Sequence, residues 1–167
     1  MSIVLARIDD RLIHGQVTVG WSQRLRPDRI VLVNDDVAED PWQTRVYASS
    51  VPPSVEVAVL TVAAAAPLLR GMAAPAAGGR AILLTANPGD MLALVRAGVG
   101  LSWINIGGLH HVPGKHALLP YVYVDAGDLG VFRELLAHGC ALVARQVPGG
   151  RELTIDEGVL DAMEGRL

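Results

Sequence analysis

Apolar runs alternate with amphipathic segments along almost the whole chain, and this alternation restricts the fold more than any other feature. The runs that fit buried strands are residues 2–8, 29–34, 54–61, 80–86, 101–108, 120–125 and 140–147. The segments with helical spacing are residues 15–25, 38–50, 62–72, 88–98 and 129–139. Continuous apolar runs separated by helices are typical of parallel strands buried on both faces. The pattern predicts an α/β fold, a three-layer α/β/α domain over residues 1–167 with a mostly parallel sheet of six or seven strands.

Proline, glycine and polar residues set the expected ends of the helices. Pro41 falls in the first turn of its helix, where a missing N–H is tolerated. Pro67 fits poorly inside a helix unless the helix begins near it, and residues 73–79 are expected to form a surface loop. Gly139 is expected to close the helix before the last strand. A short C-terminal helix is predicted with Thr154 as its cap.

Charge and composition exclude several classes of function. The net charge is −3, with 14 Lys and Arg against 17 Asp and Glu, and the basic residues are scattered. This argues against nucleic acid or an anionic membrane surface as the main partner. The N-terminus becomes charged too early for a signal peptide, and no apolar segment is long enough to span a bilayer, so a cytoplasmic protein is expected. Cys140, the only cysteine, is expected to be a buried structural thiol.

Polar residues follow four of the predicted strands. In a parallel sheet the carboxyl ends of the strands lie at one edge, and sites form in the crevice where the strand order reverses. That rule selects four segments of the chain: Asp9–His14, Asn34–Asp36, Thr85–Asn87 and Asn105–Gly108. The functional site is expected among them.

The remaining histidines and the tryptophans carry weaker signals. His110, His111 and His116 lie in a predicted loop without a cysteine pair or an ordered acidic set, so a solvated or phosphate-facing loop is favoured over a metal site. His138 ends a helix and is expected to interact with the helix dipole. Three tryptophans have strand or helix spacing and are expected in the core or at an interface: Trp21, Trp42 and Trp103.

The stretch "IDDRLIHGQV" concentrates polar groups directly after the first predicted strand. Gly15 lies where a helix should begin, and free backbone N–H groups at such an end favour an anion. Arg11 offers a fixed fork for phosphate oxygens. Asp9 or Asp10 could hold one ring nitrogen of His14 and leave the other nucleophilic. This chemistry fits a histidine that accepts a phosphoryl group, and a structural histidine stays an equal alternative at this point.

The segment "RIDDRLIHGQV" at 7–17 resembles, along its whole length, the active-site segment of the IIB components of the mannose/sorbose family of the bacterial sugar phosphotransferase system (PTS). Trp21 falls where that family often has tryptophan. The likeness continues, in order and without large gaps, through residues 30–40, 83–90, 104–115 and 139–148. The first motif is highly specific, whereas the others would be weak alone. The resemblance covers nearly the whole chain.

The resemblance implies a protein-N-phosphohistidine–sugar phosphotransferase. His14 would accept a phosphoryl group from the phosphohistidine of a IIA protein and donate it to a sugar bound by the membrane components IIC and IID, without a cofactor or metal. Arg11, Gly15 and Gln16 would bind the phosphoryl oxygens. Asp10 would orient the imidazole. The first strand would lie between the fourth and the fifth, so that flanking loops form a secondary pocket: Asp35, Thr85, Asn87, Asn105, Gly107 and Gly108.

Other functions stay open at the level of the sequence. Without a permease, the same relay would serve regulation instead of transport. A receiver-type module could use Asp9–Asp10 and Asp35–Asp36 to hold magnesium around an aspartyl phosphate, although the third strand offers no acceptor Asp at the expected place. A binding subunit of the same fold would turn over no phosphate. The expected location is cytoplasmic and peripheral to the membrane permease, and the sequence is compatible with a homo-oligomer.

Overall fold

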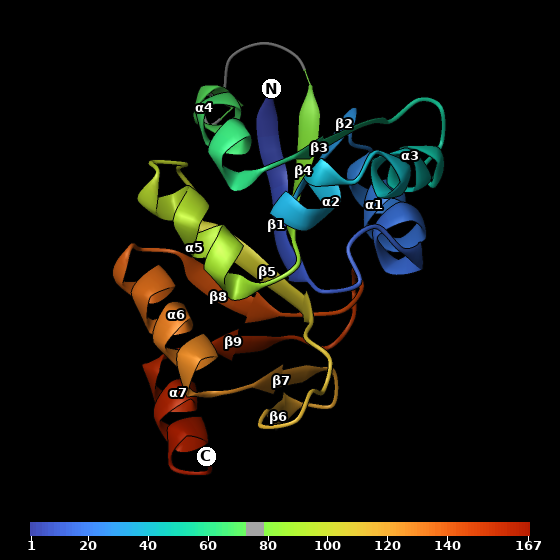
Figure 1. The fold of residues 1–167 in the computed structure, drawn as a ribbon. Coiled ribbons are helices and arrows are strands. Elements are labelled where there is room, and N and C mark those ends of the chain that lie inside the picture. The colour runs from blue at the N-terminus through green and yellow to red at the C-terminus, as the bar shows by residue number, and fades with distance from the viewer. Residues whose placement is uncertain (73–78) are drawn as a thin grey trace.

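The computed structural model describes residues 1–72 and 79–167. The strands of its main sheet are β1 (Ser2–Asp9), β2 (Arg29–Val33), β3 (Glu56–Leu60), β4 (Arg80–Thr85), β5 (Trp103–Gly108), β8 (Ala141–Ala144) and β9 (Leu153–Ile155). They follow the order β3-β2-β4-β1-β5-β8-β9, and each pair is parallel except β8 with β9 (Figure 1). The predicted mostly parallel sheet, with the first strand between the fourth and the fifth, is confirmed.

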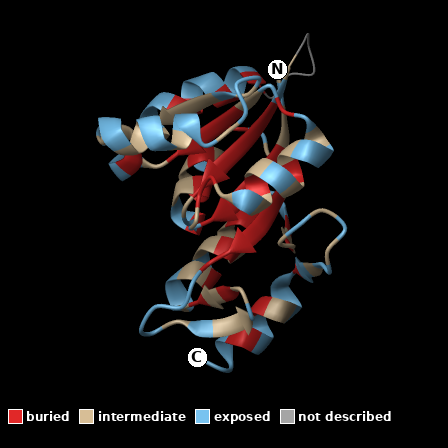
Figure 2. Ribbon diagram, turned by 90° about the vertical axis from the view of Figure 1, so that its right-hand side faces the viewer, coloured by how far each residue is buried: buried red, intermediate tan, exposed pale blue. Residues whose placement is uncertain are grey.

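Helices cover both faces of this sheet and enclose two apolar clusters, which gives the predicted three layers (Figures 1 and 2). One face carries η1 (Gln16–Trp21), which is a π-helix, α1 (Ser22–Leu25), α2 (Asp35–Glu39) and α3 (Pro41–Ser49). The other face carries α4 (Val62–Met72), α5 (Pro88–Arg96), α6 (Ala126–Ala137) and α7 (Glu157–Glu164). The buried residues follow the strands and the inner sides of the helices (Figure 2).

The central strand β1 supplies side chains to both layers, because successive residues of a strand point to opposite faces. Ala6 and Ile8 belong to the apolar cluster that α4 to α7 cover. Leu5 belongs to the cluster that η1 covers. Arg7 and Asp9 follow Leu5 at intervals of two, so they point toward the η1 layer, and both are fully buried. The face of β1 that starts apolar thus ends with two buried charges.

The predicted helix at 38–50 is two helices in the structure. Asn34 caps α2, with its side chain accepting a 2.9 Å hydrogen bond from a backbone N–H of the first turn. Asp40 then interrupts the helical path and caps α3 in the same way. Pro41 is the first residue of α3, as predicted for a residue without an N–H group.

Other helix ends agree only in part with the prediction. Pro67 lies inside α4 and not near its start. Gly139 has φ +83° and follows His138, the cap residue at the end of α6, so the predicted end of this helix is confirmed. The predicted loop at 73–79 lies outside the described residues except for its last residue.

Short pairings near the C-terminus were not predicted. The run 120–125 does not join the main sheet, because β7 (Val122–Val124) pairs antiparallel with β6 (His116–Leu119) in a separate two-stranded sheet. Thr154 does not cap α7, since it lies within the unpredicted edge strand β9. Asp156 caps α7 instead and accepts a 2.9 Å hydrogen bond from a backbone N–H of the first turn. A β-branched threonine suits a strand, whereas aspartate suits a cap.

The tryptophans and the cysteine occupy three different environments. Trp21 is buried beneath the η1 layer, and Trp103 is half-buried against the same cluster. Trp42 is 67% exposed, which excludes the core for this residue, so an interface position stays a prediction. Cys140 is buried, as predicted.

Candidate functional site

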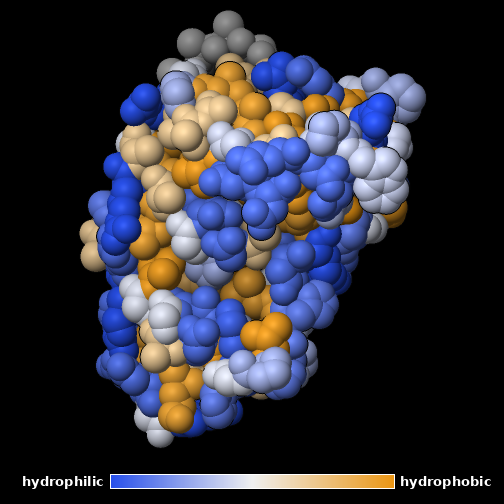
Figure 3. All heavy atoms as spheres, viewed as in Figure 1, coloured by the Kyte–Doolittle hydropathy of each residue, from blue (hydrophilic) through white to orange (hydrophobic). Residues whose placement is uncertain are grey.

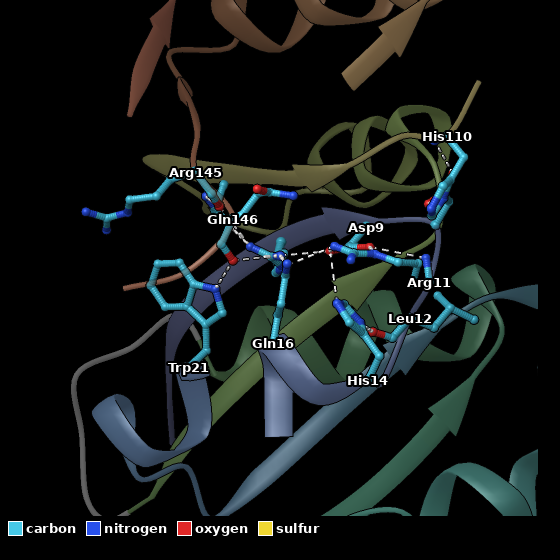
Figure 4. A network of polar contacts seen from close by, with 12 residues as sticks. Asp9, Arg11, Leu12, His14, Gln16, Trp21, His110, Arg145 and Gln146 are labelled. Atoms are coloured by element: carbon cyan, nitrogen blue, oxygen red, sulfur yellow. Dashed lines mark hydrogen bonds and ion pairs between the residues drawn. The ribbon is translucent and has the colours of Figure 1, made fainter. Parts of the chain in front are cut away.

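A buried arginine–aspartate pair lies at the carboxyl end of β1, within the polar network of Figure 4. Arg7 Nη2 is 2.8 Å from Asp9 Oδ2, and neither side chain is exposed. Arg7 Nη1 donates to Asn105 Oδ1 of β5 and, at 3.0 Å, to the carbonyl oxygen of Arg145. Arg7 Nη2 also donates to the carbonyl oxygen of Gln146 at 3.1 Å. Burial lowers the pKa of Arg7, and the Asp9 carboxylate opposes this shift. Arg7 therefore ties β1 to β5 and to the segment after β8.

The space for this guanidinium depends on Gly107 of β5. A Cβ atom at Gly107 would lie 2.0 Å from Arg7 Cζ, so the residue must lack a side chain. Trp21 also borders the guanidinium, with its ring centroid 5.7 Å from Arg7 Cζ and its Nε1 donating to the carbonyl oxygen of Gln146 at 3.0 Å. The same ring lies 5.2 Å from Cζ of Arg145, so it contacts two cations.

Arg11 extends the network from the interior to the surface. Its Nε and Nη2 donate to the two carboxylate oxygens of Asp9 at 3.0 and 2.9 Å, in the bidentate geometry of an arginine fork. Nη2 also donates at 2.8 Å to Gln16 Oε1, which accepts a second hydrogen bond from Arg7. The Arg11 side chain is 29% exposed. A Cβ at Gly108 would lie 3.2 Å from its Nη2, so a small residue at the end of β5 leaves it room.

His14 lies against the same carboxylate. Its Nε2 is 3.7 Å from Asp9 Oδ2, and its Nδ1 donates to the carbonyl oxygen of Leu12 at 2.9 Å (Figure 4). Because a carbonyl oxygen only accepts, Nδ1 carries a proton, and in the neutral form of the ring the lone pair is therefore on Nε2. Nε2 is buried and has no hydrogen-bond partner among the described residues. The side chain as a whole is 20% exposed, so its other edge reaches the surface.

The turn between β1 and η1 fixes these positions. Leu12 has φ +56°, a left-handed conformation that residues other than glycine rarely adopt. Leu12 and Ile13 bury their side chains in the core, which anchors the turn. The carbonyl oxygen of His14 accepts two backbone hydrogen bonds of 2.9 Å from η1, and Gly15 is already helical. The single helix predicted at 15–25 is therefore a π-helix followed by a short α-helix.

The prediction that Asp10 orients the His14 imidazole is wrong. Asp10 instead accepts two hydrogen bonds from His110, at 2.5 Å from Nδ1 and at 2.6 Å from the backbone N–H. Because consecutive side chains point in opposite directions at the end of a strand, Asp9 points into the η1 layer and Asp10 points away from it. The carbonyl oxygen of Leu12 holds the ring of His14 in place of Asp10.

The other predicted residues serve the ends of strands and helices. Thr85 is buried beside the end of β1, and its Oγ1 donates to the carbonyl oxygen of Asn87 at 3.1 Å. Asn87 caps α5. Asp35 Oδ1 accepts a 2.8 Å hydrogen bond from the first backbone N–H of α4. Within the described part of the chain, no hydrogen bond joins any of them to His14.

Sequence reasoning missed Arg7. The available signal was an arginine inside an apolar strand, two residues before Asp9, because residues i and i+2 of a strand share a face. Asn105 was expected in a secondary pocket and is instead fully buried. Its Nδ2 donates to the carbonyl oxygens of Val143 and Arg145 at 3.2 and 3.0 Å. Asn105 thus supports Arg7 and joins β5 to the end of β8.

Two further properties concern the described residues, 1–72 and 79–167. No helix in these ranges is both long and apolar enough to cross a membrane. The same ranges hold no group of three or more His, Cys, Asp or Glu side chains arranged to bind a metal ion. His110 and His111 lie in the loop after β5, as predicted, whereas His116 begins β6.

Comparison with known proteins identifies the family to which this chain belongs. The family model of the PTS system sorbose subfamily IIB component matches residues 3–164. The chain belongs to this family. The family resemblance drawn from the segment at 7–17 is thereby confirmed, and the protein is a IIB component of a sugar phosphotransferase system.

Individual relatives place this IIB component among sugar-specific homologues. It is 38% identical over 156 residues to the sorbose-specific EIIB component of Klebsiella pneumoniae, with 93% of each chain covered. It is 40% identical over 148 residues to the mannose-specific EIIAB component of Escherichia coli K12, which covers 88% of this chain and 45% of that relative. The crystal structure of the IIBSor domain of the K. pneumoniae sorbose permease matches with a TM-score of 0.86 at 36% identity and covers 100% of this chain and 99% of that one. The α/β fold of this IIB component is therefore that of a solved IIB domain.

Proposed function

We propose that His14 is the phosphorylated residue of this IIB component. One observation carries the proposal: the side chains of His14 and Arg11 both contact the buried carboxylate of Asp9, at the carboxyl end of the central strand. Two contacts with Asp9 fix the Arg11 guanidinium, and its partly exposed remainder is left to bind phosphoryl oxygens. Phosphoryl transfer depends on such positioning and on charge stabilisation more than on covalent assistance.

His14 takes part in two phosphoryl transfers, first as the acceptor and then as the donor. In the first, the lone pair of a His14 nitrogen forms a bond to phosphorus while the donor's P–N bond breaks and its electron pair stays with the donor imidazole. In the second, a sugar hydroxyl oxygen bonds to phosphorus, its proton passes to solvent, and the electron pair of the P–N bond returns to His14. Arg11 and the backbone N–H groups of Gly15 and Gln16 hold the equatorial oxygens.

The imidazole has to move before it accepts phosphate. Nδ1 is engaged by the carbonyl oxygen of Leu12, and Nε2 is buried beside the Asp9 carboxylate. A phosphoryl group placed beside that carboxylate would meet a like charge. Rotation of the ring, or a small shift of the turn, presents a nitrogen to the donor. The geometry therefore supports a resting state from which His14 is released at the moment of transfer.

The family and three of its relatives support the identity of the partners. A IIA phosphohistidine protein is the donor, and the E. coli mannose-specific relative, an EIIAB component, carries both parts in one chain. The acceptor is a sugar held by IIC and IID permease components, to which the IIB component binds peripherally at the cytoplasmic face. The sorbose-specific, mannose-specific and fructose-specific relatives support a sugar as the final acceptor.

A receiver-type mechanism fits the geometry less well. Asp9 accepts hydrogen bonds from both Arg7 and Arg11, which leaves its oxygens poorly suited to magnesium. Asp35 is bonded to the start of α4. Three of these four carboxylates, Asp9, Asp10 and Asp35, therefore serve protein contacts, which argues against a joint cation site.

The test is phosphorylation of the purified protein with phosphoenolpyruvate, the general phosphotransferase proteins and a IIA protein, followed by mass spectrometry. We expect one phosphoryl group on His14 that is labile in acid and stable in alkali. His14→Ala should remain folded and take no phosphate. Full labelling of that variant, or an alkali-labile phosphate that needs magnesium to form, would refute the assignment.

A further inference from the structure

One contact joins the turn after β1 to the loop after β5, two segments 100 residues apart in the chain (Figure 4). His110 donates from Nδ1 to Asp10 Oδ1 and from its backbone N–H to Asp10 Oδ2, at 2.5 and 2.6 Å. Asp10 donates its own backbone N–H to the carbonyl oxygen of Gly108 at 3.1 Å. Asp10 is therefore held at three points by the end of β5 and by the loop that follows it.

Asp10 directly precedes the residues on which the proposed function depends. Arg11 is its neighbour in the chain, and Leu12 then adopts the left-handed conformation with φ +56°. Such a conformation persists in a residue other than glycine only where the surroundings hold it. Asp9 holds the turn from the inside through the Arg11 side chain. The contact between Asp10 and His110 holds it from the outside.

The side chain of His110 is not fixed by packing in the core. It is 64% exposed, and it borders a cavity of about 260 Å³ that Arg11, Tyr121 and Tyr123 also line. The hydrogen bond from Nδ1 to Asp10 is therefore what orients the ring. Any residue at this position could supply the backbone N–H, so the specific contribution of histidine is the Nδ1 donor.

We propose that His110 is a positioning residue for phosphoryl transfer, an inference that rests on the proposed function of His14. Through Nδ1 it fixes Asp10, and Asp10 fixes the turn that carries Arg11 and His14. His110 itself does not touch the phosphoryl group. The N–H at Nδ1 is present in both the neutral tautomer that this contact selects and the protonated ring, so the contact does not require a charged histidine.

Three substitutions separate the roles of the two ring nitrogens. His110→Asn keeps an N–H donor near the position of Nδ1, His110→Gln places its amide near that of Nε2, and His110→Ala keeps only the backbone donor. The first measurement is the rate of phosphoryl transfer from a phosphorylated IIA protein, followed by rapid quench. We expect kcat to fall about tenfold in the Ala and Gln variants, the effect of one lost hydrogen bond to a charged group. The Asn variant should stay near wild type, and KM for the IIA protein should not change.

A second measurement needs no phosphoryl transfer. The exchange of the Arg11 Nε–H with water, followed by ¹H–¹⁵N NMR, should be faster in the Ala and Gln variants than in wild type and the Asn variant. Equal exchange in all four proteins, or rescue by Gln in place of Asn, would overturn the role of Nδ1. If wild-type His14 takes no phosphate, the proposed function fails, and the exchange rates still decide whether His110 positions Arg11.

The substitution Asp10→Ala tests the route of the effect. If His110 acts through Asp10, adding His110→Ala to Asp10→Ala slows transfer no further. A double variant in which the two losses multiply contradicts that route. Thermal melting followed by circular dichroism checks that each variant is folded under the conditions of both measurements.

Discussion

Asp9 and Arg7 form a buried contact, in which Asp9 Oδ2 lies 2.8 Å from Arg7 Nη2. Asp9 lies closer to Arg7 and Arg11 than to His14. The Arg11 contact with the same oxygen is 2.9 Å, whereas His14 Nε2 lies 3.7 Å away. Asp9 therefore serves first to fix two guanidinium groups. The imidazole lies at the margin of that ion network, where the carbonyl oxygen of Leu12 orients it.

The buried pair predicts a large loss of stability when its carboxylate is removed. Asp9→Asn leaves Arg7 buried without an opposite charge, which should lower the free energy of unfolding by about 3–5 kcal/mol. Urea denaturation followed by tryptophan fluorescence measures the change. Glu56→Gln is the matched control, since it breaks the partly exposed ion pair with Arg29 and should cost less than about 1 kcal/mol. Similar losses in the two variants would contradict a structural role for the Asp9 charge.

Gly107→Ala should disrupt the same pair from the opposite strand. The added Cβ would lie 2.0 Å from Arg7 Cζ, and the hydrogen bonds of Arg7 prevent the guanidinium from moving aside. We expect a loss of at least about 3 kcal/mol in the free energy of unfolding, as for a broken buried pair. Gly130→Ala is the control, because Gly130 lies within α6 with no atom near the added Cβ, and alanine favours a helix. A Gly107→Ala protein with wild-type stability would show that Arg7 has room to move.

Arg11→Lys should impair phosphoryl transfer although it keeps the positive charge. Lysine cannot contact both oxygens of Asp9 at once, so its charge is not held beside His14. We expect transfer from the IIA protein to slow on the order of tenfold to hundredfold, close to the effect of Arg11→Ala. Rapid-quench measurement of phosphorylated protein checks this. Arg96→Lys, on α5, is the control and should leave the rate unchanged. A fully active Arg11→Lys protein would show that charge alone is sufficient.

Cys140 should react slowly in the folded protein at mildly alkaline pH. Burial raises the pKa of its thiol above the ordinary value, and the thiol donates to the carbonyl oxygen of Leu101. Only the thiolate is nucleophilic, so iodoacetamide at about pH 8.5 should label the native protein far more slowly than the urea-unfolded one. Equal labelling rates would place this thiol at the surface.

The raised pKa of Cys140 also predicts how the free energy of unfolding depends on pH. The folded state keeps the Cys140 proton to higher pH than the unfolded state does. The contribution of this thiol to the free energy of unfolding is therefore fully present below the pKa of the unfolded thiol. That contribution declines as the pH rises from about 8.5, the ordinary thiol value, through the raised folded pKa. Urea denaturation between pH 7 and 10 should show this decline in wild type. The decline should be smaller in Cys140→Ala, and equal slopes in the two proteins would contradict it.

Much of this architecture follows from the sequence because apolar runs and helical spacing report burial directly. The strands of the parallel core and the position of His14 after the first of them were predicted correctly. The short strands β6 and β9 were not, because three or four residues carry too little pattern to separate a strand from a loop. Thr154 was assigned to a helix cap for the same reason.

The polar network could be predicted only in part. Arg7 is a single charge in an apolar strand, and its partners at Asn105 and Gln146 come from distant segments. Asp10 lies close to His14 in the sequence, but in the structure it pairs with His110, which is 100 residues away along the chain. Local spacing reveals which residues are present near a site. The pairing among them depends on the direction of each side chain at the end of β1.

The position of β1 in the middle of the sheet determines when the site can assemble during synthesis. A chain leaves the ribosome N-terminus first, yet β1 pairs with strands that begin at Arg80 and Trp103. Arg7 finds its last carbonyl partner only at Gln146. Until β5 has emerged, β1 lacks one of its two neighbours in the sheet, and until Gln146 has emerged, the guanidinium of Arg7 lacks its last carbonyl partner. A nascent chain interrupted before Gln146 therefore lacks a contact that holds Arg7, so the proposed phosphoryl site can take its final form only after this residue has been translated.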